Sequence, residues 1–285
     1  GKCGVSVCPA KATLTATISG ATDPAADSNG ILSPDVVFLP VAAGQPARHD
    51  FCVRALKQAS VGTRKVTFGV MNDNSLRGPQ WQRFVGEYLA PKLGGSRAAW
   101  AEANKTVVER EMARFGEVPS GKSYLDFWRE EELRWIREMC ELVGVDTPGT
   151  DEECSRLSRA TNSYVIAGVE SAIPGAVDAI RSLHGMGYTL YTASGEYSLD
   201  LQGYLAAMGV RQLFERVYGP DLINTWKGGR LYYDRIFGDA RVQPSECLVI
   251  DDSPTAVQGA REAGATAVLV SADPPPTTSA DAVLS

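Results

Sequence analysis

Two adjacent acids and one lysine follow apolar stretches of this 285-residue chain and could do chemistry together. Asp251 and Asp252 come directly after an apolar run, and Lys227 stands in a loop upstream of them. Another stretch ends at Thr192 and is followed by Ser194, so it supplies two hydroxyls. Adjacent carboxylates repel unless a cation neutralises them, and oxygen-only ligands suit Mg²⁺. A lysine and hydroxyls opposite such a metal suit the oxygens of a phosphoryl group.

The elements around these residues must bring them to one place. Downstream of Pro174, short β-rich runs alternate with amphipathic helices. Such alternation is typical of a parallel sheet covered on both faces, so we predict a Rossmann-like α/β core. In these sheets ligands bind beyond the carboxyl ends of the strands, where the polar loops gather. The predicted strands are 65–71, 188–192, 214–218, 247–250 and 266–270, and the predicted helices are 175–183, 199–208, 232–240 and 255–263.

A helical block separates the first predicted strand from the others. Its clearest helix begins at Ser123, which with Asp126 can cap the start, and ends at Val143 before Gly144. Residues 1–64 differ from the body, because they contain no Glu, Trp or Tyr and carry a charge of about +2. The predicted organisation is a disordered or atypical extension over 1–64, an α/β core over 65–79 and 169–285, and a helical insertion over 80–168.

Composition excludes several function classes. The net charge of −6 argues against nucleic acid or an anionic membrane as the main partner. No apolar run is long enough for a membrane-spanning helix. His49 and His184 are the only histidines, which excludes a His-rich zinc site and leaves little material for a Ser-His-Asp triad. The six cysteines include no C-x-x-C pair, so we expect free thiols in a reducing cytoplasm.

Asp251 and Asp252 by themselves have a simpler interpretation, as acids stabilised by the dipole at a helix N-terminus. Lys227 and Thr192 at matching strand ends favour the phosphate interpretation instead. The combination resembles the haloacid dehalogenase superfamily of phosphohydrolases. The segments that carry the resemblance are Tyr188–Thr192, Lys227 and Leu248-Val-Ile-Asp-Asp252, within a region of about 65–270. The resemblance implies that the block 80–168 is the cap that this superfamily inserts into its core.

The resemblance also implies a mechanism. An Asp after the first strand attacks phosphorus, and a second Asp two residues further on protonates the leaving group and then activates water. A hydroxyl and a lysine hold the phosphoryl group, and Mg²⁺ bridges the nucleophile and the fourth-strand acid. The implied catalytic residues are Asp73, Ser75, Thr192 and Lys227; the substrate-binding residues are Thr192, Ala193, Ser194 and Lys227; the Mg²⁺ ligands are Asp252, Asp251 and Asp73.

The first strand departs from the superfamily pattern Asp-x-Asp-x-Thr. One register lays Met71, Asp73 and Ser75 on the pattern, and a second puts Gly69 and Met71 on its two acids. We prefer the first because it keeps the acid/base and a hydroxyl. The nucleophilic Asp is missing in both, and Met is neither an acyl-phosphate former nor a hard oxygen ligand.

These observations predict a Mg²⁺-dependent phosphatase that acts on a small phosphorylated metabolite, with weak or absent activity, as a monomer or homodimer. The alternative is an inactive relative that binds a phosphate ligand or a partner. A haloacid dehalogenase is a third reading, and it would also need the missing Asp. Cap residues that could choose the substrate are Trp81, Tyr88, Trp128 and Arg129.

Overall fold

The computed structural model describes residues 65–68, 71–115, 122–270 and 282–284. Our prediction for residues 1–64 lies outside these ranges. Within them, one sheet holds parallel strands in the order β3-β2-β1-β4-β5-β6, which confirms the Rossmann-like α/β core. The strands are β1 (Lys65–Phe68), β2 (Thr189–Thr192), β3 (Phe214–Arg216), β4 (Cys247–Asp251), β5 (Thr266–Val270) and β6 (Ala282–Leu284).

The register of the central strand fixes where the polar loops meet. Phe68 of β1 lies opposite both Thr192 of β2 and Ile250 of β4. The carboxyl ends of these three strands therefore reach the same level of the sheet. We call this level of the sheet the strand-end edge, and we predicted the functional residues to lie beyond it.

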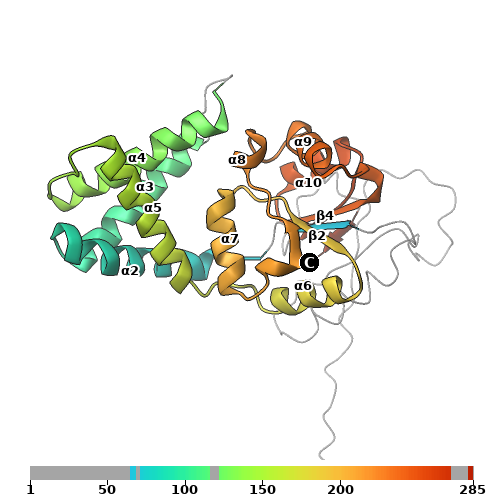
Figure 1. The fold of residues 1–285 in the computed structure, drawn as a ribbon, viewed down its shortest axis with the longest axis horizontal. Helices are drawn as coiled ribbons and strands as arrows, with labels where there is room; N and C mark the ends of the chain where they lie inside the picture. Colours follow the sequence, from blue (N-terminus) through green and yellow to red (C-terminus); the bar gives the residue numbers. More distant parts are fainter. Residues whose placement is uncertain (1–64, 69–70, 116–121, 271–281, 285) are drawn as a thin grey trace, which may run out of the picture.

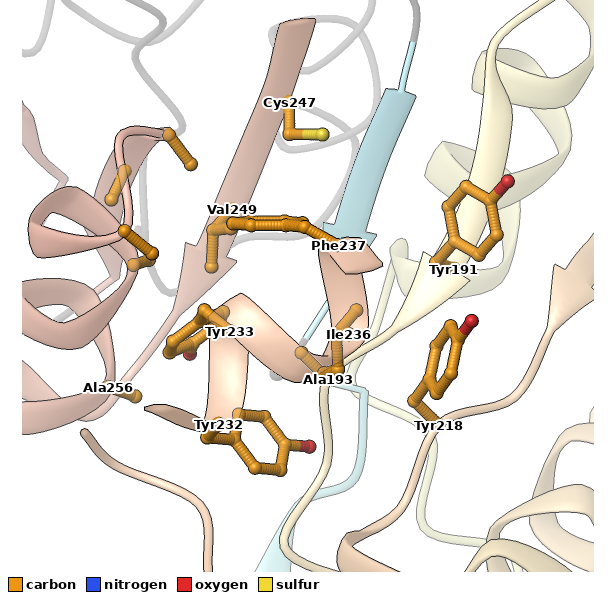
Figure 2. Close-up of a cluster of buried hydrophobic side chains, with 14 of the residues drawn as sticks. Tyr191, Ala193, Tyr218, Tyr232, Tyr233, Ile236, Phe237, Cys247, Val249 and Ala256 are labelled. Atoms are coloured by element: carbon orange, nitrogen blue, oxygen red, sulfur yellow. The ribbon is translucent and has the colours of Figure 1, made fainter. Parts of the chain in front are cut away.

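Helices cover both faces of the sheet, and successive side chains of a strand point to opposite faces. In β4, Leu248 and Ile250 pack against α6 (Ala176–Gly185) and α7 (Ser198–Ala207). Val249 points to the opposite face, against α9 (Arg230–Ala240) and α10 (Pro254–Glu262). Figure 2 shows this second cluster, in which the α9 side chains Tyr232, Tyr233, Ile236 and Phe237 lie by β4. Fully burying each large apolar side chain of this kind stabilises the fold by ~1.5–3 kcal/mol.

The helical insertion stands to one side of the sheet as a bundle (Figure 1). Ser123 caps α4 by accepting a bond from the Asp126 N–H at 3.2 Å, and Gly144 ends the helix with a φ of 75°. Both features agree with the sequence prediction. The bundle consists of α2 (Asn74–Leu93), α3 (Arg97–Phe115), α4 (Tyr124–Val143) and α5 (Asp151–Gly168).

The bundle begins earlier than we predicted. We expected the helical insertion over 80–168, yet its first helix, α2, already begins at Asn74. The side chain of Asp73 caps that helix, so the polar segment after β1 is its N-terminus. At the other end of the insertion's clearest helix, Leu142 of α4 is apolar but 44% exposed, because the buried stripe ends at Cys140.

The bundle and the sheet meet through α5 and α7. Gly203 of α7 lets Ile166 approach closely, since an added Cβ would lie 2.6 Å from Ile166 Cγ2. Tyr204 of α7 is buried within the apolar cluster of the cap rather than that of the sheet. A short helix, α8 (Pro220–Ile223), lies between α7 and α9 in the chain. Among the described helices, none combines the length and apolar character that a membrane crossing requires.

Candidate active site

The end of β4 holds an ion pair inside the protein. Nζ of Lys227 lies 2.7 Å from Oδ2 of Asp251, whose side chain is 0% exposed. The Ser253 N–H donates to the other carboxylate oxygen of Asp251 at 3.0 Å. Burial raises the pKa of Asp251, and Lys227 and the Ser253 N–H oppose that shift by favouring the charged form. The pair therefore fixes a cationic amine at the strand-end edge.

Tight packing fixes the loop that carries the amine. The backbone of helix α10 lies very close to the two glycines after Lys227. A Cβ added to Gly259 of α10 would lie 2.7 Å from the Gly229 carbonyl carbon. Gly228 has a φ of 127°, which side chains larger than hydrogen rarely adopt. Glycine is thus required at position 259 by the close approach and at position 228 by the backbone conformation.

The loop after β2 places two hydroxyls differently. Thr192 is fully buried, and its hydroxyl donates to the Tyr218 carbonyl at 2.9 Å. Ser194 is half-buried, and its Oγ accepts from the Glu196 N–H at 3.1 Å. The Tyr232 hydroxyl donates to the Ser194 carbonyl at 2.7 Å and so ties the loop to α9. Ser194 is therefore the more available hydroxyl of the two. Ala193, between them, is buried in the sheet core.

The end of β1 has a different character. The side chain of Met71 is buried among the apolar residues of α6, α7, β2 and β4. Asp73 accepts from the Ser75 N–H at 2.8 Å and from the Ser75 hydroxyl at 2.6 Å, which lowers the pKa of Asp73. The carboxylate of Asp73 thus acts as a helix cap here. Gly69, the nucleophile position in the second register, lies outside the described residues.

The acids predicted to bind Mg²⁺ do not converge. Asp252 is exposed, Asp251 is bound to Lys227, and Asp73 is engaged with Ser75. In the described ranges, no three His, Cys, Asp or Glu side chains form a group that could hold a metal ion. The arrangement therefore does not fit a magnesium site built from all three predicted ligands.

A cavity of about 550 Å³ opens between the cap and the strand-end edge. Gly195, in the loop after β2, lines it, and a Cβ added there would lie 3.8 Å from Cδ of Lys227. Asn74 lines it beside the end of β1. Trp81 and Trp128, two of our candidates for substrate choice, also line it, whereas Tyr88 and Arg129 do not. Cavities of this size accept small organic ligands.

The cavity also contains charged residues that the sequence did not lead us to predict as part of a site. Arg77 of α2 forms an ion pair with Glu196 of the loop after β2 and so joins cap to core. Burial and like-charged neighbours raise the pKa of Glu111 to about 7 and that of Asp200 to about 7. Arg77, Glu111 and Asp200 lie within helices and not after a strand, so the rule that located Asp251 does not reach them.

Known proteins resemble the chain over the same region. The family model for haloacid dehalogenase-like hydrolases matches residues 80–264. Pyrimidine 5'-nucleotidase PynA of Streptococcus pneumoniae is 30% identical over 155 residues, which is 52% of this chain and 63% of that protein. Fructose-1-phosphate phosphatase YqaB of Escherichia coli is 30% identical over 92 residues, 32% of this chain and 48% of that protein. This chain thus spans less than two thirds of the length of either relative.

A solved structure shares the fold. HAD-hydrolase YfnB from Bacillus subtilis, bound to magnesium, has a TM-score of 0.53 at 18% identity, over 76% of this chain and 90% of that one. The family match extends over more than half of the chain and agrees with the sheet order and the inserted helices. The chain belongs to the haloacid dehalogenase-like hydrolase family.

Proposed function

We propose that this hydrolase acts on small phosphate esters, with the phosphoryl group at the strand-end edge and the alcohol part in the cavity under the cap. The observation that carries the proposal is the Lys227–Asp251 pair, which holds an amine at the carboxyl end of the sheet. The amine is 18% exposed, so it can reach phosphate oxygens while one face contacts Asp251. The two curated relatives, a nucleotidase and a sugar phosphatase, support the same chemistry.

In this proposal Lys227 and Ser194 hold the phosphate oxygens, and Thr192 supports the loop from below by its bond to Tyr218. Asp73 would serve as the acid/base once substrate displaces Ser75. Met71 in our preferred register, and Gly69 in the second, stands where the superfamily pattern has its nucleophilic Asp, so turnover should be slow. Halide release from a haloacid would need the same missing nucleophile and is disfavoured for that reason.

The burial of Met71 favours a second candidate function, binding of a phosphate ester without turnover. A methionine packed among apolar side chains contributes to the core and takes no part in phosphoryl transfer. The two functions differ only in the rate of the chemical step. Both require the same phosphate site, so binding and turnover must be measured separately.

Mg²⁺ dependence remains a prediction. Asp252 is an exposed carboxylate directly after β4, and we expect it to be the main ligand. Mg²⁺ should raise the Tm of the full chain, and Asp252→Asn should remove most of that rise. An equal rise in both proteins would place the metal elsewhere.

The experiment that tests the proposed function measures inorganic phosphate binding by calorimetry and hydrolysis of an aryl phosphate with and without Mg²⁺. We expect the full chain to bind phosphate and the double variant Lys227→Gln/Asp251→Asn to lose that binding. The double variant removes both charges at once, so it avoids a buried charge without a partner. Undiminished phosphate binding in this variant would reject the site. Binding without hydrolysis would select the second function.

A further inference from the structure

The cavity under the cap contains more negative than positive charge. Six carboxylates line it, against two cations, Arg77 and Lys105. Arg77 is bound to Glu196, and Lys105 is exposed. The lining acids are Glu109, Glu111, Glu131, Glu132, Glu196 and Asp200.

Three of these acids already have cationic partners. Glu196 is paired with Arg77, and the buried Glu131 is paired with Arg134 and, at 2.7 Å, with Arg114. Glu132 lies 3.5 Å from Arg159. These partners offset the charge of those three acids, and one of them, Arg77, itself lines the cavity.

Of the other three acids, Glu109 is exposed, whereas Glu111 and Asp200 are largely buried and have no ion-pair partner among the described residues. The side chains that raise the pKa of Glu111 are Glu131, Glu196 and Glu138, against Arg114 alone. Those that raise the pKa of Asp200 are Glu196, Asp221 and Glu132, against a hydrogen bond with Asn162. Glu196, which also lines the cavity, is among the like-charged neighbours of both groups. A ligand cation would relieve a cost that the protein alone does not offset.

The other lining groups suit an organic cation rather than a hydrated ion. The indoles of Trp81 and Trp135 stand nearly perpendicular, with an interplanar angle of 78° and centroids 6.5 Å apart. Trp128 adds a third indole to the lining. Tyr204 already holds a cation over its ring, with Cζ of Arg77 5.8 Å from the centroid. Aromatic faces beside carboxylates are the surroundings in which proteins bind alkylammonium groups.

We propose that this cavity binds the alkylammonium part of a phosphate ester and so selects phosphorylated amino alcohols over sugar and nucleoside phosphates. This inference rests on the proposed function only for the position of the phosphate. The substrates in the names of the two curated relatives carry a neutral sugar or a nucleoside in place of an ammonium group. The phosphate would contact Lys227, and the cation would lie toward Glu111 and Asp200.

The test uses two pairs of ligands that differ in charge and hardly in shape. Choline is compared with 3,3-dimethylbutan-1-ol, and phosphocholine with 3,3-dimethylbutyl phosphate, by calorimetry on the full chain. At about pH 8, above the pKa of both carboxyls, we expect each cationic ligand to bind about tenfold more tightly than its neutral isostere. The double variant Glu111→Gln/Asp200→Asn should lose this preference. Glu109→Gln, which removes an exposed acid of the same lining, should keep it.

The outcomes separate this inference from the proposed function. Equal affinities within each pair, or an unchanged preference in the double variant, would overturn the cationic specificity. Tighter binding of uridine monophosphate or fructose 1-phosphate than of phosphocholine would also overturn it. Preference for choline in Lys227→Gln/Asp251→Asn, with no phosphate binding in any form, would support the cation site and reject the phosphate site.

Discussion

The ends of β1 and β4 are neighbours in the sheet, yet one carries a buried ion pair and the other a buried apolar side chain. At the end of β4 a fully buried carboxylate is kept in place by a lysine and a backbone N–H. At the end of β1 the corresponding position of our preferred register, Met71, is an apolar core residue. The same edge therefore keeps the lysine–carboxylate pair where we propose that phosphate binds, and has a methionine where our preferred register places the nucleophile. In the proposed function, binding and bond-breaking depend on separate strands, so one could be lost while the other remains.

The largest expected effect comes from adding a nucleophile at the end of β1. Phe68, the last residue of β1, pairs with Thr192 and Ile250 at the strand-end edge, and Gly69 follows it in the sequence. We expect Gly69→Asp to raise hydrolysis of an aryl phosphate by on the order of 10³-fold. Met71→Asp, which our preferred register favours, should give no gain, because the new carboxylate would be buried among apolar side chains. Rapid hydrolysis by Met71→Asp alone would restore that register.

The second prediction concerns the charges at the end of β4. Lys227→Met leaves Asp251 buried without its cation, and we expect a loss of about 3 kcal/mol in the free energy of unfolding. Lys227→Met/Asp251→Leu removes both charges and should recover much of that loss. Asp252→Asn changes an exposed acid next to the pair and should stay within about 0.5 kcal/mol. Urea denaturation measures all three, and an equal loss in the single and double variants would show that the pair contributes nothing specific.

The third prediction is a pH dependence that arises in the cavity and not at either strand end. The folded-state pKa values of Glu111 and Asp200, about 7 each, lie above their ordinary values of 4.5 and 3.8. The folded protein thus binds these protons more tightly than the unfolded chain. Their contribution to stability is full below about pH 4 and is lost as the pH rises towards 7.

We expect this loss to be about 2 kcal/mol, a value reduced for the water that enters the cavity. The measurement is the free energy of unfolding between about pH 4 and 8 for the full chain and for Glu111→Gln/Asp200→Asn. The variant should show the flatter curve. Parallel curves would mean that neither carboxyl is perturbed by folding.

Much of the sheet was predictable from the sequence, and much of the cavity was not. Strands such as 247–250 and 266–270 are short apolar runs between helices, and local pattern suffices to find them. Asp251 was predictable for the same reason, since it ends β4, whereas Lys227 lies in the loop between α8 and α9 and is brought to that strand end by the fold. Arg77, Glu111 and Asp200 lie on helix faces, where charged residues are ordinary. Only the packing of the cap against α7 makes them part of one cavity, and no local pattern encodes that packing.

The first strand shows the other limit of sequence reasoning. We chose the register with Met71 because it retained Asp73 and Ser75 as catalytic groups. The structure uses Asp73 and Ser75 to begin α2, a role that Asp and Ser fill equally well. A cap and a catalytic acid have the same residue types at the same spacing here, so the sequence alone does not separate the two roles.

The smallest expected effect links the cap to the intact strand end through Trp226, the residue before Lys227. Its ring lies 5.1 Å from that of Tyr124 and 5.0 Å from that of Phe127, both edge-on and both on α4. The N–H of Leu125 donates to Oδ1 of Asn224 at 3.2 Å, so the first turn of α4 holds the Lys227 loop at two points.

Trp226→Leu keeps an apolar side chain and loses both edge-on contacts, which are worth about 1 kcal/mol together with the positioning they provide. We therefore expect phosphate affinity to fall about fivefold, as measured by calorimetry. Trp128→Leu is the matched control, because Trp128 also joins cap to core, by stacking on Tyr197 at 5.4 Å, but does not adjoin Lys227. It should lower the Tm by a similar amount and leave phosphate affinity unchanged. If both variants weaken phosphate binding equally, the cap acts on the site through its general closure, and Trp226 has no particular role in positioning the lysine.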